Sequence, residues 1–546
     1  MPIHILQEKM KSISAKENVA ILVSLIKEWG INNVVVCPGS RNAPIVHTLG
    51  NTDGVICHPV TDERSAAFVA LGIADATKKV VAVCCTSGSA VLNMSPAIAE
   101  AYYRHIPLLI ISADRPSEWI GQMDGQTLMQ PNCFGPHAMC YDINEVHDNL
   151  TRWATERNVN EALMRLMQPN ATPIHINIHL SEPLFVFEEK ELPKVKKIEQ
   201  YINYSDSERL IKNWGEAKNK LIVIGQLRPD DDIKNLLIEL SKMNDVAIVA
   251  EHLANIDDIN NLIWRADDIL ATKRDTVNLN PDLVVYIGGH IVSKRIKQWL
   301  RTVKPNVWHI TDENRIIDLF QAVTHIVTSD CFLATMSKIV SEKNIDSNNN
   351  YCQIWLDKQN SLQPIDIQKW TDVAVVGEAL SAMPENWCLS LGNSSTVRHA
   401  QHFKLPQNTI VFCNRGVNGI DGSMSQAVGC ALSTKKNVLC ILGDLSFFYD
   451  MNALWNVALP SNLHILVINN GGGSIFATLP GLEQSEHKWT LVAAQHNTQV
   501  KGWAESCNCH YQVATRENMN ELFVTADRPI VFEAFANKCG IDFEQQ

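Results

Sequence analysis

The feature that most constrains the fold is an alternation, repeated along the whole chain, of short apolar runs with segments of helical length. Many of the apolar runs are rich in Val and Ile, and this alternation is typical of parallel sheets covered by helices on both faces. A chain of 546 residues is also too long for one hydrophobic core. The sequence therefore predicts an α/β protein with three doubly wound parallel-sheet domains.

Two polar stretches, residues 187–200 and 341–350, divide the apolar runs into three blocks. We expect domains at residues 1–186, 201–345 and 365–546, with the first and third similar in fold. Strands are predicted at residues 32–39, 54–60, 80–88, 106–116 and 173–180; at 220–226, 245–252, 282–290 and 306–311; and at 387–394, 409–416 and 529–535, with two more leading into residues 443–444 and 469–472.

The charge balance excludes several classes of partner. A net charge of −12 argues against general affinity for nucleic acid or an anionic membrane. No run of 18 apolar residues is present, so no membrane span is expected, and the N-terminal stretch lacks the apolar core of a signal peptide. The fifteen cysteines show no paired zinc-site spacing, which indicates reduced thiols in a cytoplasmic protein.

Two predicted strands of the third block end in oxygen-bearing side chains. "ILGDLSFFYD" (441–450) leads into Gly443 and Asp444, and "LHILVINNGG" (463–472) ends in two asparagines and two glycines. Ligands gather beyond the carboxyl ends of parallel strands, and Mg²⁺ prefers oxygen ligands. Asp444, the Asn470 side chain and the Gly472 carbonyl can therefore hold a divalent cation, with a diphosphate completing its coordination.

The loop after each strand also suits a diphosphate. Gly443 permits close backbone approach, and the helix predicted after Asp444 can direct free amides, including that of Ser446, at phosphate oxygens. Taken alone, a Gly-Asp pair after a strand is most often only a helix N-cap. Its pairing with the asparagines favours the cation site.

The Gly-Asp pair, followed 26 positions after Asp444 by Asn470 in "NNGG", resembles the diphosphate and metal motif of thiamine diphosphate enzymes. That resemblance implies a pyrimidine-binding first domain, a central domain and a diphosphate-binding third domain. It also implies a catalytic glutamate that shares a proton with the cofactor's pyrimidine ring. Glu63, in "HPVTDERSAAFVALGIA" (58–74), matches that position, and its apolar neighbours favour a raised pKa. The alternative is that Asp62 and Glu63 only favour the positive end of a helix.

Basic residues at predicted strand ends indicate the kind of substrate. A single Arg at a strand end is ordinary solvated surface. Several such residues in all three blocks suggest a substrate pair rich in carboxylates. The set comprises Arg41, Arg115, Lys294, Arg295, Arg398 and Arg415.

These motifs and their order, from about residue 34 to residue 535, resemble the SEPHCHC synthase family of menaquinone biosynthesis. The resemblance implies a transferase that decarboxylates 2-oxoglutarate on thiamine diphosphate and adds the succinyl carbanion to isochorismate in a 1,4 fashion. Ile420 would be the apolar wedge that bends the cofactor. The implied substrate pocket contains Ser40, Arg41, Arg115, Gln126, Lys294, Arg295, Ser394, Arg398 and Arg415, with an apolar wall of Ile475, Phe476 and Leu479.

Two positions depart from the family pattern. An Asn-Gln pair in the family is Gly125-Gln126 here, and Asn-Asn-Asn-Gly-Gly is "NNGGG", which keeps Asn470 but loosens the loop behind it. Neither change removes a catalytic group. None of the 18 histidines falls in a motif, and structural roles are expected for them.

Other functions remain as alternatives. An acetolactate synthase or a 2-oxo acid decarboxylase would share the architecture, but would not need the basic set. A Rossmann-like nucleotide-binding protein would need GxGxxG, which "VVVCPGSR" and "LIVIGQLRP" lack. A catalytically inactive homologue would not need Glu63, Asp444 and Asn470. We expect a cytoplasmic homodimer or dimer of dimers with sites at subunit interfaces; the choice between Mg²⁺ and Mn²⁺ stays open.

Overall fold

The structure is a computed structural model that describes residues 12–195, 197, 208–256, 259–272, 276–312, 317–341, 349–456, 458–479 and 481–536. Most of the N-terminal stretch examined for a signal peptide, and parts of both predicted linkers, lie outside these residues. Three six-stranded sheets follow one another along the chain, and every strand pair in them is parallel. The α/β fold class with three parallel-sheet domains is confirmed.

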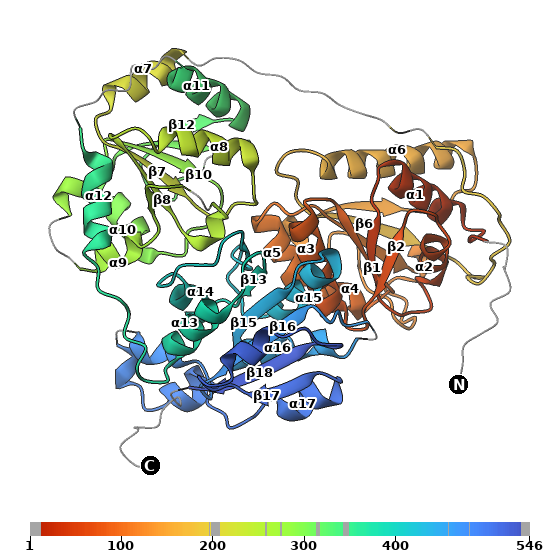
Figure 1. The fold of residues 1–546 in the computed structure, drawn as a ribbon. Helices are drawn as coiled ribbons and strands as arrows, with labels where there is room; N and C mark the ends of the chain where they lie inside the picture. The colour runs from red at the N-terminus through yellow and green to blue at the C-terminus, as the bar shows by residue number, and fades with distance from the viewer. Residues whose placement is uncertain are drawn as a thin grey trace. The chain divides into compact units, whose positions relative to one another are not determined.

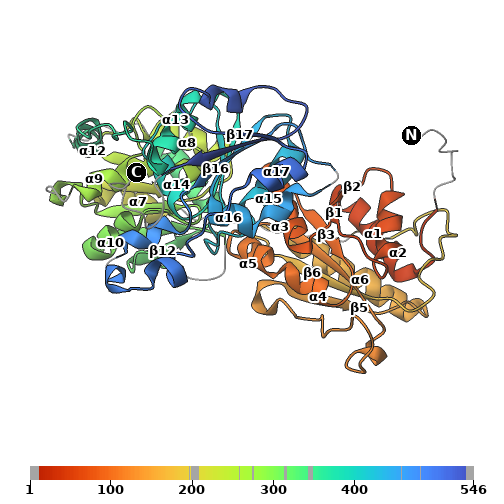
Figure 2. The same ribbon diagram turned by 90° about the horizontal axis from the view of Figure 1, so that it is seen from below.

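The first sheet has the strand order β2-β1-β3-β4-β6-β5. Its core on one face is formed with α1, α2 and α6, while α3 and α5 pack together on the other (Figure 2). The strands are β1 (Asn33–Val36), β2 (Ile56–Pro59), β3 (Val81–Cys85), β4 (Leu108–Asp114), β5 (Met139–Ile143) and β6 (Ile174–His179). The helices are α1 (Glu17–Glu28), α2 (Ala43–Gly50), α3 (Glu63–Thr77), α4 (Ser89–Asn93), α5 (Ser95–Tyr103) and α6 (Asn149–Leu166).

The central sheet has the order β12-β11-β10-β7-β8-β9, which is that of a doubly wound dinucleotide-type fold. Figure 1 shows α7, α8 and α11 on one face and α9, α10 and α12 on the other, each set with its own apolar core. The strands are β7 (Lys220–Ile224), β8 (Val246–Ala250), β9 (Leu262–Ile263), β10 (Leu283–Ile287), β11 (Asn306–Ile310) and β12 (Val323–Val327). The helices are α7 (Glu208–Glu216), α8 (Asp231–Leu240), α9 (Ala266–Ala271), α10 (Lys294–Val303), α11 (Ser329–Ser341) and α12 (Tyr351–Asn360).

The third sheet, β14-β13-β15-β16-β18-β17, repeats the strand order of the first, which confirms the expected similarity of these blocks. Helices α13 and α14 and the 3₁₀ turn Met519–Phe523 cover one face. The strands are β13 (Cys388–Leu391), β14 (Ile410–Phe412), β15 (Val438–Gly443), β16 (Leu463–Asn469), β17 (His510–Val513) and β18 (Ile530–Phe535). The helices are α13 (Asp372–Ala382), α14 (Ser395–Ala400), α15 (Ser423–Ser433), α16 (Asp444–Tyr449) and α17 (Lys501–Ser506).

By internal contacts the chain separates into two units. The first unit contains Met1–Tyr201 together with Met424–Lys435 and Asp450–Pro460. The second unit contains the rest of the chain, so most of the central and third blocks fall together. The domain boundaries expected from the sequence stay predictions.

The described residues contain no helix that is long and apolar enough to span a membrane. All fourteen cysteines in that part of the chain are free thiols. The most deeply buried strands are the apolar ones at the sheet centres, such as β3 and β16, in which every residue is buried.

Candidate active site

The second unit holds a pocket of about 120 Å³ at the carboxyl ends of β13, β15 and β16. β13 lies between β14 and β15, so the chain order reverses there, and such a switch point is where open α/β sheets bind ligands. Nine of the predicted site residues line the pocket. They are Ser394, Ile420, Gly443, Asp444, Ser446, Asn470, Gly472, Ile475 and Phe476.

Asp444 is the first residue of α16, but its carboxylate serves more than that helix. Oδ1 accepts from the Leu445 amide at 2.7 Å, and Oδ2 accepts from the Gly471 and Gly472 amides at 2.7 and 3.0 Å. The His496 ring nitrogen Nε2 lies 3.3 Å from the same Oδ2. Burial raises the pKa of Asp444, and these donors and His496 oppose the rise. Asp444 therefore joins the ends of β15 and β16, which an N-cap alone does not do.

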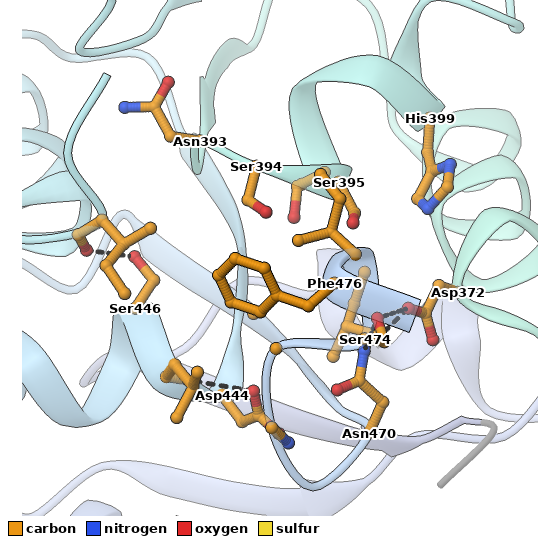
Figure 3. Close-up of a pocket in the computed structure, with 18 residues that line it drawn as sticks. Asp372, Asn393, Ser394, Ser395, His399, Asp444, Ser446, Asn470, Ser474 and Phe476 are labelled. Atoms are coloured by element: carbon orange, nitrogen blue, oxygen red, sulfur yellow. Dashed lines mark hydrogen bonds between the residues drawn. The ribbon is translucent and has the colours of Figure 1, made fainter. Parts of the chain in front are cut away.

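Asn470 is buried, and its two amide atoms have different surroundings. Its Nδ2 donates to Asp372 Oδ2 at 2.8 Å and to Ser474 Oγ at 2.9 Å. Figure 3 shows the nitrogen turned toward Asp372 and Ser474, with the oxygen turned the other way. That oxygen has no hydrogen-bond partner among the described residues. A buried oxygen without a donor is a ready ligand for a cation.

The pocket residues fit a divalent cation bound together with a diphosphate. Asp444 accepts three hydrogen bonds and keeps acceptor capacity on Oδ1, while Asn470 Oδ1 is unpaired. Apart from Gly443 and its two chain neighbours, no described residue has an atom within 4 Å of where a Cβ at Gly443 would stand, so this glycine leaves open space at the pocket. No cluster of three His, Cys, Asp or Glu residues suited to a metal occurs among the described residues. The protein offers too few ligands for a full shell, which leaves room for phosphate oxygens and water.

The loop of glycines after Asn470 adopts backbone conformations that few other residues tolerate. Gly472 has φ of +147°, and a Cβ there would lie 2.8 Å from the Ala493 carbonyl oxygen. Its own carbonyl accepts from the Ser474 amide at 3.1 Å. A Cβ at Gly473 would lie 2.7 Å from the Phe476 ring, so that ring packs directly over the loop.

An apolar wall closes another side of the pocket. Ser446 Oγ donates to the Ile420 carbonyl at 2.6 Å, and this bond fixes the loop that carries the Ile420 side chain. Ile475 and Phe476 line the pocket beside it, whereas Leu479, with 39% of its surface exposed, does not. Its predicted role is not supported by this placement and stays a prediction.

Arg398 and Arg415 do not line the pocket, but each donates a hydrogen bond to a residue that does. Arg415 is buried and donates from Nη1 to Asn393 Oδ1 at 2.8 Å, while Arg398 donates to the Ser394 carbonyl. Burial lowers the pKa of Arg398, and the charge of Arg415 adds to that effect. Two guanidinium groups that repel each other in this way are chemically suited to share an anion.

The other predicted basic residues of this unit begin α10. Lys294 is the first residue of the helix, and Ser293 caps it by accepting from the Ile296 amide at 3.0 Å. Arg295 pairs with Asp267, and both Lys294 and Arg295 are exposed.

In the first unit, Glu63 begins α3 directly after the N-cap Asp62, which accepts from the Ser65 amide at 2.8 Å. The helix-start alternative thus holds for Asp62. Burial raises the pKa of Glu63 and the charge of Asp62 raises it further, while a hydrogen bond from Asn93 lowers it. The predicted direction of this shift is confirmed, and its main cause is burial.

The remaining predicted residues of the first unit follow β1 and β4. Arg41 is buried, donates to the Leu180 carbonyl at 2.9 Å and pairs with Glu182 at 3.1 Å. Arg115 pairs with Asp124 at 3.1 Å. Burial lowers the pKa of Arg41, and the charge of Arg115 lowers it further. Ser40 and Gln126 are exposed, and Gln126 has φ of +57°.

Several polar residues that line the pocket were not predicted from the sequence, among them Asp372, Asn393 and His399. Asp372, whose pKa is raised by burial, orients Asn470 from the start of α13. Asn393 donates to the Asn414 and Gly419 carbonyls at 2.7 and 2.6 Å and so ties two loops together. His399, with a pKa lowered to about 4 by burial, is a neutral lining residue. Of these three, only Asn393 stood in a segment that the sequence had singled out.

Models of three protein domains match the chain in order. They are the thiamine pyrophosphate enzyme N-terminal TPP binding domain at residues 17–135, the middle domain of thiamine pyrophosphate at 183–389, and the C-terminal TPP binding domain at 391–534.

Similar full-length proteins share one name, 2-succinyl-5-enolpyruvyl-6-hydroxy-3-cyclohexene-1-carboxylate (SEPHCHC) synthase. The protein from Bacteroides fragilis is 42% identical, over 96% of this chain and 97% of its own length. The protein from Phocaeicola vulgatus is 40% identical over 96% of both chains. The one from Flavobacterium johnsoniae is 36% identical over 94% of this chain and 95% of its own length.

Proposed function

We propose roles for the residues of this chain from one premise: the chain belongs to the SEPHCHC synthase family of thiamine diphosphate enzymes. It is a transferase that carries out thiamine diphosphate-dependent SEPHCHC synthesis in menaquinone biosynthesis. The reaction decarboxylates 2-oxoglutarate and adds the resulting succinyl unit to isochorismate. When bound, the cofactor supplies the stabilised carbanion that this chemistry requires.

The cation and diphosphate roles fall to the pocket of the second unit. Asp444, the Asn470 side chain and the Gly472 carbonyl would bind Mg²⁺ or Mn²⁺, and Gly443 and Ser446 would lie against the diphosphate. The observation that carries this assignment is the unpaired, buried Oδ1 of Asn470, whose amide nitrogen is held by Asp372 and Ser474. Ile420, held by Ser446, would support the body of the cofactor.

Glu63 would be the catalytic carboxyl group that shares a proton with the pyrimidine ring nitrogen. Its burial and its raised pKa support that role, because a group that gives and takes a proton near neutral pH works best with a pKa close to that pH.

The substrates would be recognised through their carboxylates. Arg41, Arg115, Lys294, Arg295, Arg398 and Arg415 would supply the charge, with Ser40, Gln126 and Ser394 as polar contacts and Ile475, Phe476 and Leu479 as apolar ones. Arg41, Arg115 and Arg295 each pair with a protein carboxylate, which a substrate carboxylate can replace at little electrostatic cost.

The assembly would be a homodimer or a dimer of dimers in the cytoplasm. Each active site would combine Glu63 of one subunit with the pocket of another. The free cysteine thiols of the described residues support a reducing compartment.

Co-expression of two inactive variants tests the composite site. Glu63→Gln should bind cofactor without turnover, and Asp444→Ala should bind cofactor weakly. In randomly paired dimers, half would carry one intact site of two, so activity should recover toward about a quarter of the wild-type value. Recovery near zero, with both variants folded and associated, would contradict a site shared between subunits.

A further inference from the structure

Residues 251–255 contact the elements that carry or precede two pairs of basic residues, Lys294 with Arg295 and Arg398 with Arg415, which the proposed function places in the substrate pocket. The segment follows β8 and consists of Glu251, the 3₁₀ turn His252–Ala254 and Asn255. One end of it reaches the loop before α10, which begins with Lys294. The other end reaches α14, which carries Arg398, and β14, which precedes Arg415.

Glu251 is a buried carboxylate that accepts hydrogen bonds from two adjacent backbone amides. Oε2 accepts from Val292 at 2.6 Å and Oε1 from Ser293 at 2.7 Å. These are the two residues before Lys294, and Ser293 is the N-cap of α10. The carboxylate therefore fixes the backbone from which Lys294 and Arg295 project.

The charge of Glu251 is also balanced from the third block. Burial raises the pKa of Glu251, while the Val292 and Ser293 amides and the charge of Arg415 lower it. Arg415 is itself buried, and its Nε has no hydrogen-bond partner among the described residues. Glu251 thus compensates a buried guanidinium group without using all of its donors.

The neighbours of Glu251 anchor the segment to the elements around Arg398 and Arg415. His252 Nε2 donates to the Ala400 and Phe403 carbonyls at 3.0 and 2.8 Å, at the end of the helix that carries Arg398. Asn255 donates to the Val411 carbonyl at 3.0 Å and accepts from the Val411 amide at 2.6 Å.

A buried carboxylate is costly, and a well-packed apolar group often serves stability as well or better. Glu251 instead uses its carboxylate to hold the Val292 and Ser293 amides just before Lys294. We propose that Glu251 is a positioning residue of the substrate pocket, which holds Lys294 and Arg295 at a fixed place relative to Arg398 and Arg415. This inference rests on the proposed function, because those four residues are its substrate contacts.

Glu251→Gln tests the proposal, because glutamine keeps the size but loses the charge and one acceptor. We expect KM for at least one dicarboxylate substrate to rise about tenfold or more, with kcat at saturation changed less than about threefold. Affinity for thiamine diphosphate with Mg²⁺, measured by tryptophan fluorescence, should stay within about twofold. Glu251→Asp keeps the charge and should recover part of the loss in KM.

Asp245→Asn is the matched control. Asp245 accepts from Lys220 Nζ at 2.5 Å at the other end of the central sheet, so this change should lower Tm without altering either KM. If Glu251→Gln does not fold, Glu251→Asp carries the test, with a raised KM expected. A folded variant with both KM values within about twofold of wild type would overturn the proposal.

Hydrogen exchange separates this proposal from the proposed function. Without any substrate, the peptide over residues 288–300 should exchange faster in the Glu251 variants than in wild type. Unchanged exchange would overturn the anchoring role whatever the enzyme does. Absence of turnover in the wild type would instead count against the proposed function alone.

Discussion

At the scale of single residues, the site depends on polar side chains that hydrogen bonds hold in place and that still have capacity to accept. Asp444 collects three backbone amides, and Asn470 directs its amide nitrogen to Asp372. Both arrangements fix a side chain before any ligand arrives. This reduces the conformational entropy that the side chains lose when the ligand binds. The remaining acceptor capacity of Asp444 Oδ1 and the unpaired Oδ1 of Asn470 are then available to a cation.

Removal of the Asp444 carboxylate should weaken the binding of the cation. We expect Asp444→Ala to lower Mg²⁺ and thiamine diphosphate affinity by at least about tenfold, since a charged ligand is lost. Cofactor with Mg²⁺ should raise the Tm of the wild type by mass action, but raise that of the variant much less. Calorimetric titration and thermal unfolding measure both effects.

Asp357→Ala, an exposed carboxylate on α12, serves as the control and should behave like wild type. A wild-type cofactor titration for Asp444→Ala would contradict the ligand role.

His179 should give the protein a pH-dependent stability. Burial acts to lower its pKa, but bonds to Asp142 at 2.9 Å and to the Arg115 carbonyl at 2.5 Å outweigh this and raise it to about 9. Because the pKa of His179 is raised in the folded state, its protonated ring contributes its full stabilisation below the ordinary pKa of 6.5. That stabilisation is lost as pH rises through about 9. In urea unfolding, the stability advantage of wild type over His179→Gln should therefore shrink between pH 6 and pH 9.5. An advantage independent of pH would show that His179 is not charged.

The residues that the sequence predicted in the pocket share a local cue. Asp444, Asn470 and Phe476 each stand in or beside a strand-end motif that one stretch of chain displays. Asp372 lacked any such cue, because an acidic residue after Thr371 at a helix start looks like ordinary capping. Its contact with Asn470 spans 98 residues and appears only in the folded chain.

At the scale of elements, the strands missed by the sequence analysis are all sheet edges. β5, β9, β12 and β17 are each the outermost strand of a sheet. Edge strands are half exposed and short, so they lack the continuous apolar run by which interior parallel strands are recognised. The interior strands were all predicted.

The helix that begins with Glu63 depends on close packing through glycine. A Cβ at Gly72 of α3 would lie 2.2 Å from the Gln426 carbonyl oxygen, and a Cβ at Gly429 of α15 would lie 2.2 Å from that of Val69. The two helices therefore approach each other backbone to backbone, and each contributes a glycine. Figure 1 shows α3 and α15 side by side.

Gly429→Ala should push the two helices apart. Alanine gains about 1 kcal/mol of helix propensity, but overpacking against a carbonyl costs about 1–3 kcal/mol, and here the clash should win. Thermal unfolding should show a lower Tm. Gly50→Ala, at the exposed last residue of α2 with open space at its Cβ, should be neutral or stabilising. Equal Tm values for both variants would contradict the packing account.

At the scale of the whole molecule, the first and third sheets share one strand order and the central sheet has another. The sequence predicted three blocks and the similarity of two, because both follow from the apolar runs. It did not predict that residues 424–435 and 450–460 group with the first block. That grouping depends on contacts between distant segments, such as the 2.9 Å bond from Asn452 to Asp62.

The measurement that tests the account most directly is the loss of isochorismate by the purified protein with thiamine diphosphate and Mg²⁺. Parallel reactions would contain 2-oxoglutarate or pyruvate. We predict that isochorismate is consumed only with 2-oxoglutarate, with carbon dioxide released in equal amount. Persistence of isochorismate while carbon dioxide is released from either acid would contradict the synthase function and leave only the thiamine diphosphate chemistry.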